Sequence, residues 1–145
     1  MDAVNSSGQT EPRYRYAIDC GRAQIFIYAR SLATVLRVDG EIDGCNADRV
    51  AAEIRRFGRV KAPMILDLSH LEFMGMEGFQ ALLALNHEHR AAGFYCTVVA
   101  GSAMRPVLRI VSDHGLPLVQ SVPEALQLIE DALAGRRQVL QRLVR

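Results

Sequence analysis

The sequence predicts a single α/β domain with a mixed, mostly parallel sheet of four to five strands covered by about four helices. Three observations lead to this prediction. The chain has 145 residues, which suits one domain. Half of its residues are hydrophobic and 23% are charged, as is usual for a globular protein. From residue 34 onward, short apolar runs alternate with segments whose apolar residues recur at helical spacing.

The individual elements follow from the period of the apolar residues and from the turn residues between them. In chain order they are two strands at 24–29 and 34–38, a turn at 39–44, a helix at 47–57, a buried strand at 64–68, a helix at 76–92, a strand at 94–100, a short helix capped by Ser102, an edge strand at 116–119, and a helix opened by a capping box of Ser121 and Glu124. A short turn near Ser31 joins the first two strands, which are therefore antiparallel if they pair. Glycines are expected to end the long helices, at Gly58, Gly93 and Gly135.

The charge distribution divides the chain into three parts. Residues 1–15 are polar and are interpreted as a flexible leader, and residues 16–135 as the domain. Residues 136–145 contain four arginines and no acid, so the rest of the chain has a net charge of −3 against a total of +1. This basic tail can extend the last helix, with Val139 and Leu140 among the apolar residues on one side. Such a segment suits self-association, partner docking or a membrane surface, and a frayed end is the plainer alternative.

Composition excludes several classes of protein. A net charge of +1 provides no field that would attract nucleic acid. The three cysteines, Cys20, Cys45 and Cys96, are far apart and form no C-x-x-C pair, which argues against a disulfide scaffold and suits a reducing compartment. No apolar run is long enough to span a membrane, and the first residues lack the pattern of a signal peptide. A cytoplasmic location is therefore expected.

The sequence contains no phosphate-binding, dinucleotide-binding, nucleophile-elbow or zinc-protease motif, so it predicts neither an enzyme nor a cofactor. His87 and His89 are two residues apart on a helix and point to different sides, which favours a solvated surface over a metal site. Asp67, Ser69 and His70 have the residue types of a hydrolase triad. Because sequence neighbours rarely adopt triad geometry, Ser69 is expected to turn the chain and His70 to lie on the surface.

Two stretches together carry a family resemblance. Residues 35–43 read V-L-R-V-D-G-E-I-D, a strand that runs into a Gly-Glu-aliphatic-Asp turn. Residues 65–79 read I-L-D-L-S-H-L-E-F-M-G-M-E-G-F. In this order and at this spacing they resemble the STAS domain of bacterial anti-sigma factor antagonists, over roughly residues 24–134. The resemblance implies a STAS-like fold and a regulatory protein-binding module whose partner is a kinase-like anti-sigma factor or another signalling protein.

In that family the second stretch usually reads D-L-S-x-V-x-F-M-D-S-S-G-L, and the partner phosphorylates the first serine of D-S-S. In this chain Met76 stands at that serine, between Gly75 and Glu77. Methionine has no hydroxyl, so the usual phosphorylation switch is absent at this position. The residues that the resemblance implies for the partner surface are Gly40, Glu41, Asp43, Gly75, Met76, Glu77, Gly78 and Phe79.

Several alternatives stay open at this point. Met76 either presents a flexible apolar side chain to a partner or packs against the sheet. Glu77 either mimics the phosphorylated serine or stabilises the helix start through the helix dipole. STAS-like domains are also suggested to bind small ligands or nucleotides, which makes a sensing module the alternative function. Cys45 is the candidate for redox control, because thiols in the N-terminal turn of a helix are reactive. A homodimer is the remaining alternative for the partner.

Overall fold

The computed structural model describes residues 16–59 and 62–144. The predicted leader at 1–15 and Arg145 in the tail lie outside the described residues. The strands are β1 (Tyr16–Cys20), β2 (Ala23–Arg30), β3 (Ala33–Ile42), β4 (Met64–Asp67), β5 (Leu71–Met74), β6 (Cys96–Val99) and β7 (Leu118–Val119). The helices are α1 (Ala47–Phe57), α2 (Met76–Ala91), α3 (Arg105–Ile110), α4 (Val122–Val144) and the 3₁₀ turn η1 (Ser102–Met104).

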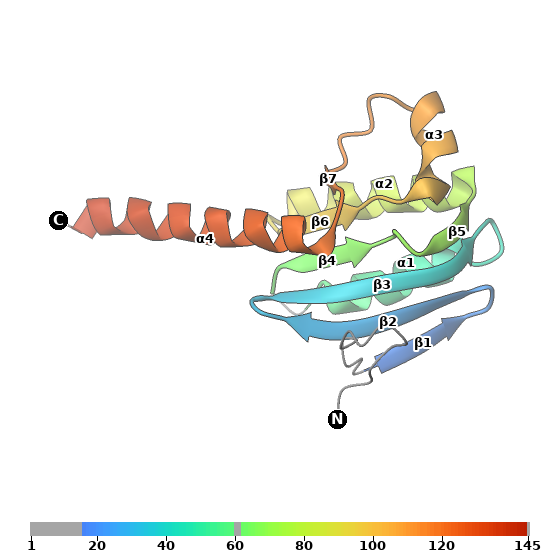
Figure 1. Cartoon of the computed structure of the whole chain (residues 1–145), viewed down its shortest axis with the longest axis horizontal. Helices are drawn as coiled ribbons and strands as arrows, with labels where there is room; N and C mark the ends of the chain where they lie inside the picture. The colour runs from blue at the N-terminus through green and yellow to red at the C-terminus, as the bar shows by residue number, and fades with distance from the viewer. Residues whose placement is uncertain (1–15, 60–61, 145) are drawn as a thin grey trace, which may run out of the picture.

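The strands form one mixed sheet (Figure 1). Its order is β1-β2-β3-β4-β6-β7, and β5 pairs with the end of β3. The first three strands are antiparallel, whereas β3, β4, β6 and β7 are parallel neighbours. The predicted α/β class, mixed sheet and four helices are confirmed, and the sheet has seven strands where four to five were predicted.

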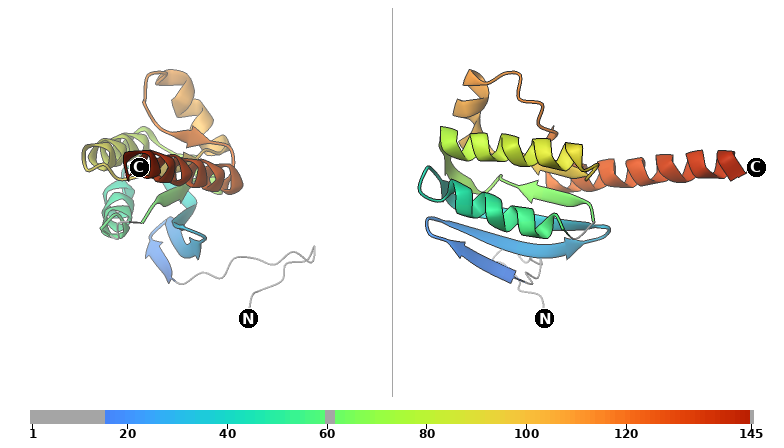
Figure 2. Two further views of the ribbon diagram at one scale, coloured as in Figure 1. Left: turned by 90° about the vertical axis from the view of Figure 1, so that its left-hand side faces the viewer. Right: turned by 180° about the vertical axis from the view of Figure 1, so that it is seen from behind.

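Helices cover both faces of the sheet. Helices α1 and α2 lie together on one face, which Figure 2 shows from behind, and the start of α4 packs on the other. Strand β4 is buried at all four positions because it lies between these layers. Successive side chains of a strand point to opposite faces, so Met64 and Leu66 join the larger core under α1 and α2, while Ile65 joins the smaller core under α4.

Four local predictions differ from the structure. β3 continues to Ile42, through most of the expected turn at 39–44. Ser102 begins η1, and its side chain caps no helix. Gly135 does not end the last helix, because α4 continues to Val144. Its Cβ position has no neighbour within 4 Å, so nothing forces the chain to turn there. The side chain of Glu124 accepts a hydrogen bond from the amide of Gln120, one residue earlier than in a standard capping box.

Candidate functional site

The two motif segments, about thirty residues apart in sequence, lie side by side at one end of the domain (Figure 1). The end of β3 pairs in parallel with β5, which places Glu41 opposite Phe73 and Ile42 opposite Met74. The amide of Gly75 donates a hydrogen bond of 2.8 Å to the carbonyl oxygen of Ile42. The turn after β3 and the start of α2 therefore form one continuous region. We call this region the β3–α2 surface and define it by Gly40, Glu41, Asp43, Phe73, Gly75, Met76 and Glu77.

Gly78 and Phe79 lie beneath the β3–α2 surface. A β-carbon on Gly78 would stand 2.7 Å from Ile42 Cγ2, closer than real β-carbons approach, so glycine lets α2 begin this near to β3. Phe79 is fully buried, and its amide donates to the carbonyl oxygen of Gly75 over 3.1 Å. These two residues position the surface from below and do not reach solvent.

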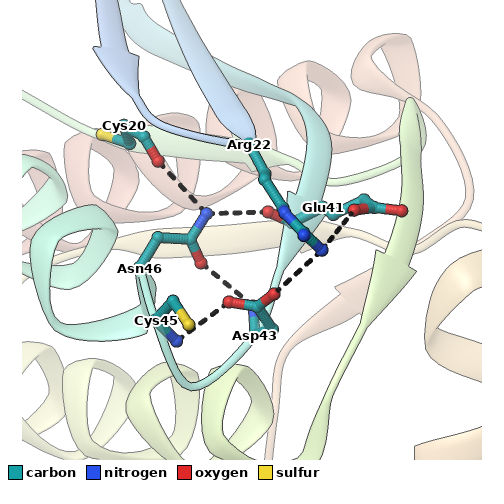
Figure 3. A network of polar contacts seen from close by, with 6 residues as sticks. All are labelled: Cys20, Arg22, Glu41, Asp43, Cys45 and Asn46. Carbon is teal, nitrogen blue, oxygen red and sulfur yellow. Dashed lines mark hydrogen bonds and ion pairs between the residues drawn. The ribbon is translucent and has the colours of Figure 1, made fainter.

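A buried amide holds the turn that follows β3 (Figure 3). Asn46 is 6% exposed, and its Oδ1 accepts a hydrogen bond from the amide of Asp43 over 3.0 Å. Its Nδ2 donates to the carbonyl oxygens of Glu41, at 2.8 Å, and Cys20, at 3.2 Å. One side chain thus connects the end of β1, the end of β3 and the start of α1, and fixes where the carboxylates of the turn point.

The turn between β1 and β2 approaches the same region closely. Gly40 has φ +94°, and a β-carbon there would fall 2.1 Å from the carbonyl oxygen of Arg22. The next amide, of Glu41, donates to that same oxygen over 3.0 Å. Position 40 therefore requires glycine, both for its backbone conformation and for the space.

The charged groups of the β3–α2 surface are mostly acidic. Arg22 Nη1 lies 3.5 Å from a carboxylate oxygen of Glu41 and 3.7 Å from one of Asp43. The Arg22 side chain is 73% exposed, so these pairs orient the groups and add little stability. Glu77 is exposed in the first turn of α2, where the helix dipole favours an acid, and its side chain passes beside Gly44. Two carboxylates thus flank one guanidinium, and Glu77 adds a third carboxylate to the surface.

Two apolar side chains complete the surface. Met76 is half-buried and packs in part against the larger core, and contact of its exposed part with a partner stays a prediction. Phe73 is 49% exposed on β5. Phe73 is not among the predicted site residues, because residues 71–74 carry no sequence pattern that marks the strand on which this ring lies beside Gly75.

The three cysteines have different environments, and all are free. Cys45 is exposed at the turn before α1, with its amide donating to Asp43 Oδ1 over 2.9 Å. Burial raises the pKa of the Cys20 thiol, and it raises that of Cys96 to about 12. Redox control through Cys45 stays a prediction.

Asp67, Ser69 and His70 form a turn after β4 and have no triad geometry. The hydroxyl and the amide of Ser69 both donate to Asp67 Oδ1, over 2.6 and 3.0 Å. His70 Nε2 stands 3.9 Å from the other Asp67 oxygen, on an exposed side chain. The serine hydroxyl is bonded to the carboxylate and not to the imidazole, so the serine–histidine contact of a triad is not formed.

The prediction of a solvated surface is wrong for His89, which is 8% exposed, although His87 is exposed. Burial lowers the pKa of His89. Across residues 16–59 and 62–144, no group of three or more histidines, cysteines or carboxylates could hold a metal ion.

Known proteins resemble this chain in sequence and in fold. The STAS domain family matches residues 24–117. Osmosensory protein A of Mycobacterium tuberculosis is 38% identical over 133 residues, with 88% of this chain and 84% of that protein covered. The crystal structure of an anti-sigma factor antagonist from Mycobacterium paratuberculosis is 27% identical, with a TM-score of 0.66 and coverage of 74% of this chain and 94% of that one.

The unphosphorylated anti-sigma factor antagonist SpoIIAA shares the fold at 19% identity, with a TM-score of 0.59 over 74% of this chain and 96% of that one. Within the described part of the chain, no helix has the length and apolar character needed to cross a membrane. The family match covers well over half of the chain, and the start of α2 at residue 76 agrees with the sequence-based expectation. The chain is a member of the STAS domain family, with the fold of the anti-sigma factor antagonists.

Proposed function

We propose that this protein is a regulator that binds an anti-sigma factor, or a related kinase-like signalling protein, through the β3–α2 surface. The observation that carries the proposal is the meeting of the two motif segments, which places Met76 at the start of α2 beside the turn after β3. Phe73 and Met76 supply apolar contact area, and the carboxylates around them supply polar contacts at the edge. This mixture of an apolar centre and a polar rim is typical of protein interfaces.

The proposed complex is not controlled by phosphorylation at residue 76. In relatives, a phosphoserine at this position adds nearly two negative charges to the start of the helix. Met76 cannot accept a phosphoryl group, so the apolar contact is permanent. Glu77 carries a single charge, is exposed, and lies in the first turn, where stabilisation of the helix accounts for its position.

The test measures binding to each purified anti-sigma factor of the source organism, using Met76→Arg and a matched control. Leu140→Arg introduces the same side chain at a 60% exposed position on α4, which projects from the opposite end of the molecule (Figure 1). We expect Met76→Arg to weaken binding by about tenfold or more, since it places a charge in the apolar centre. Leu140→Arg should bind like the wild type. Equal binding by all three proteins would contradict the proposed surface.

A third variant examines the missing switch. Met76→Ser restores a hydroxyl at the position that relatives phosphorylate. With ATP and a kinase-type partner, this variant should gain one phosphoryl group and then lose affinity, while the wild type gains none at residue 76. If phosphorylated Met76→Ser keeps its affinity, then Glu77 or the surface as a whole already tolerates the charge, and the proposal of a permanent apolar contact is wrong.

A sensing role is the second candidate, and one observation favours it. The relative from Mycobacterium tuberculosis is named Osmosensory protein A. Regulation in response to osmotic stress fits a protein that signals by association. An osmotic upshift of the source cell should then change the fraction of this protein recovered in complex with its partner.

A further inference from the structure

A cleft of about 340 Å³ opens at the far end of α2 from the β3–α2 surface. It is enclosed by the last turns of α2, by the residues just before and at the start of β6, and by the segment around Gly115. The side chains that line it include Asn86, His89, Arg90, Phe94, Tyr95 and Cys96. Its volume falls at the lower end of the range of small-molecule sites, about 300–1,000 Å³. The cleft is therefore large enough for a ligand built around one ring.

The wall of the cleft is cationic. Arg90 is exposed and is the ionised group among the lining residues, and no aspartate or glutamate lines the cleft. The nearest acidic residue along the helix, Glu88, is turned away and forms a bidentate pair with Arg55, at 2.8 and 3.0 Å. Asn86 ties the helix to the opposite wall by donating to the carbonyl oxygen of Gly115 over 3.3 Å. An anionic group entering the cleft would find Arg90 available.

His89, one of the residues that line the cleft, has a polar atom that lacks a partner. His89 is buried, and its Nδ1 has no hydrogen-bond partner among the described residues. Burial lowers the pKa of His89, so its ring is neutral and presents one N–H and one bare nitrogen. Unpaired buried polar atoms are rare in folded proteins, and each requires an explanation. The cavity that lies beneath, about 10 Å³, is at the lower limit for a single water.

The remaining walls are aromatic and uncharged. The ring of Phe94 lies 4.9 Å from the ring of His89, centre to centre, and Tyr95 follows it in the lining. Cys96 adds a neutral thiol, because burial raises its pKa to about 12. Aromatic walls favour a flat ring in the ligand.

We propose that this cleft binds a small aromatic carboxylate. The carboxylate pairs with Arg90, and the ring lies against Phe94 beside His89. The site uses none of the residues of the β3–α2 surface, so it goes beyond the proposed function and stands or falls independently of it.

The test is a ¹H–¹⁵N NMR titration of the full chain at fixed ionic strength with benzoate, 4-hydroxybenzoate and, as the uncharged analogue, benzamide. Ligands of this size bind at millimolar concentration when they bind at all, so affinities of the order of 1 mM are expected. Both carboxylates should shift the amides of Asn86, His89, Arg90 and Gly115, which line the cleft. Benzamide should bind at least about fivefold more weakly.

Arg90→Gln removes the charge at an exposed position and should weaken the binding of both carboxylates about fivefold or more. Arg109→Gln, which changes another exposed arginine, on α3, should leave their binding unchanged. Three results would overturn the proposal. One is the absence of shifts at the cleft with either carboxylate. Another is equal affinity for benzamide, and the third is equal weakening by the two glutamine variants, which would indicate an unspecific charge effect.

Discussion

Replacement of Asn46 by alanine offers a direct test of how the β3–α2 surface is held in place. The side chain is 6% exposed and makes three hydrogen bonds to backbone groups, with the amide of Asp43 and the carbonyl oxygens of Glu41 and Cys20. Alanine removes all three bonds and leaves a small void. The backbone groups remain, and those that stay buried lose a partner that water cannot easily replace.

The expected loss follows from these three bonds. A net contribution of about 1 kcal/mol each sums to about 3 kcal/mol, with a further penalty for groups left buried without a partner. Asp43 is half-buried, so its amide regains water in part, which reduces the total. We therefore expect the free energy of unfolding to fall by about 2–3 kcal/mol. For a chain of this size that corresponds to a fall in Tm of roughly 5–12 °C.

Urea unfolding followed by circular dichroism measures this change, with the midpoint and the m-value fitted together. Gln24→Ala is a suitable control, since its side chain makes one exposed amide-to-carbonyl bond, to Gly21 over 3.2 Å. It should cost no more than about 0.5 kcal/mol. If Asn46→Ala also costs less than about 0.5 kcal/mol at an unchanged m-value, then the buried amide does not hold the turn and the reasoning is refuted.

Three further predictions follow from single positions. Gly40→Ala should lower the free energy of unfolding by more than about 2 kcal/mol, because alanine is strained at φ +94° and its Cβ would meet a backbone oxygen. A variant that is as stable as the wild type in urea unfolding would contradict this. The pKa of His89 is lowered by burial below the value of about 6.5 expected for the unfolded chain, so protonation favours unfolding, and stability should fall as the pH drops below about 6.5. The pH dependence should be shallower in His89→Gln, and parallel curves would refute the assignment. Iodoacetamide should modify the exposed Cys45 of the native protein well before the buried Cys20 and the half-buried Cys96, because burial raises the pKa of both of these thiols; mass spectrometry can establish the order.

The sequence predicted the central helices well, because apolar residues recur there at helical spacing and glycines follow the ends of the helices. Helix α1 has the predicted bounds, and α2 ends one residue before the predicted limit of 92. The strands that were missed, β1 and β5, lack such signals. Four of the five residues of β1 are at least partly exposed, and β5 has only four residues with no alternation of apolar and polar side chains. Their pairing is decided by long-range contacts that a local pattern does not contain.

Two other differences have physical reasons of their own. Glycine usually ends a helix, but its cost inside one is only about 1 kcal/mol, and Leu140 resumes the apolar stripe of α4 beyond Gly135. His89 was assigned to the surface from its neighbour His87. Its spacing from Leu82 and Leu85, seven and four residues, would have indicated the buried face instead.

The candidate site was only partly accessible to sequence reasoning. The motifs identified the turn after β3 and the start of α2, and the structure brings these segments together. Phe73 and Arg22 were missed. The position of Phe73 depends on the bulged pairing of β5 with β3, and that of Arg22 on the close approach of the β1–β2 turn to Gly40. Neither contact has a signature in the local sequence.

The final turns of α4 also affect how the molecule moves in water. The helix lies along the long axis of the molecule, and its last nine residues, 136–144, add about 14 Å at 1.5 Å per residue (Figure 1). Leu140 and Val144 on this segment are 60% and 85% exposed. A compact chain of 145 residues would have a radius of gyration of about 15 Å. The projecting helix makes the particle longer than such a sphere, so its rotational diffusion is anisotropic and its scattering profile is that of an elongated body.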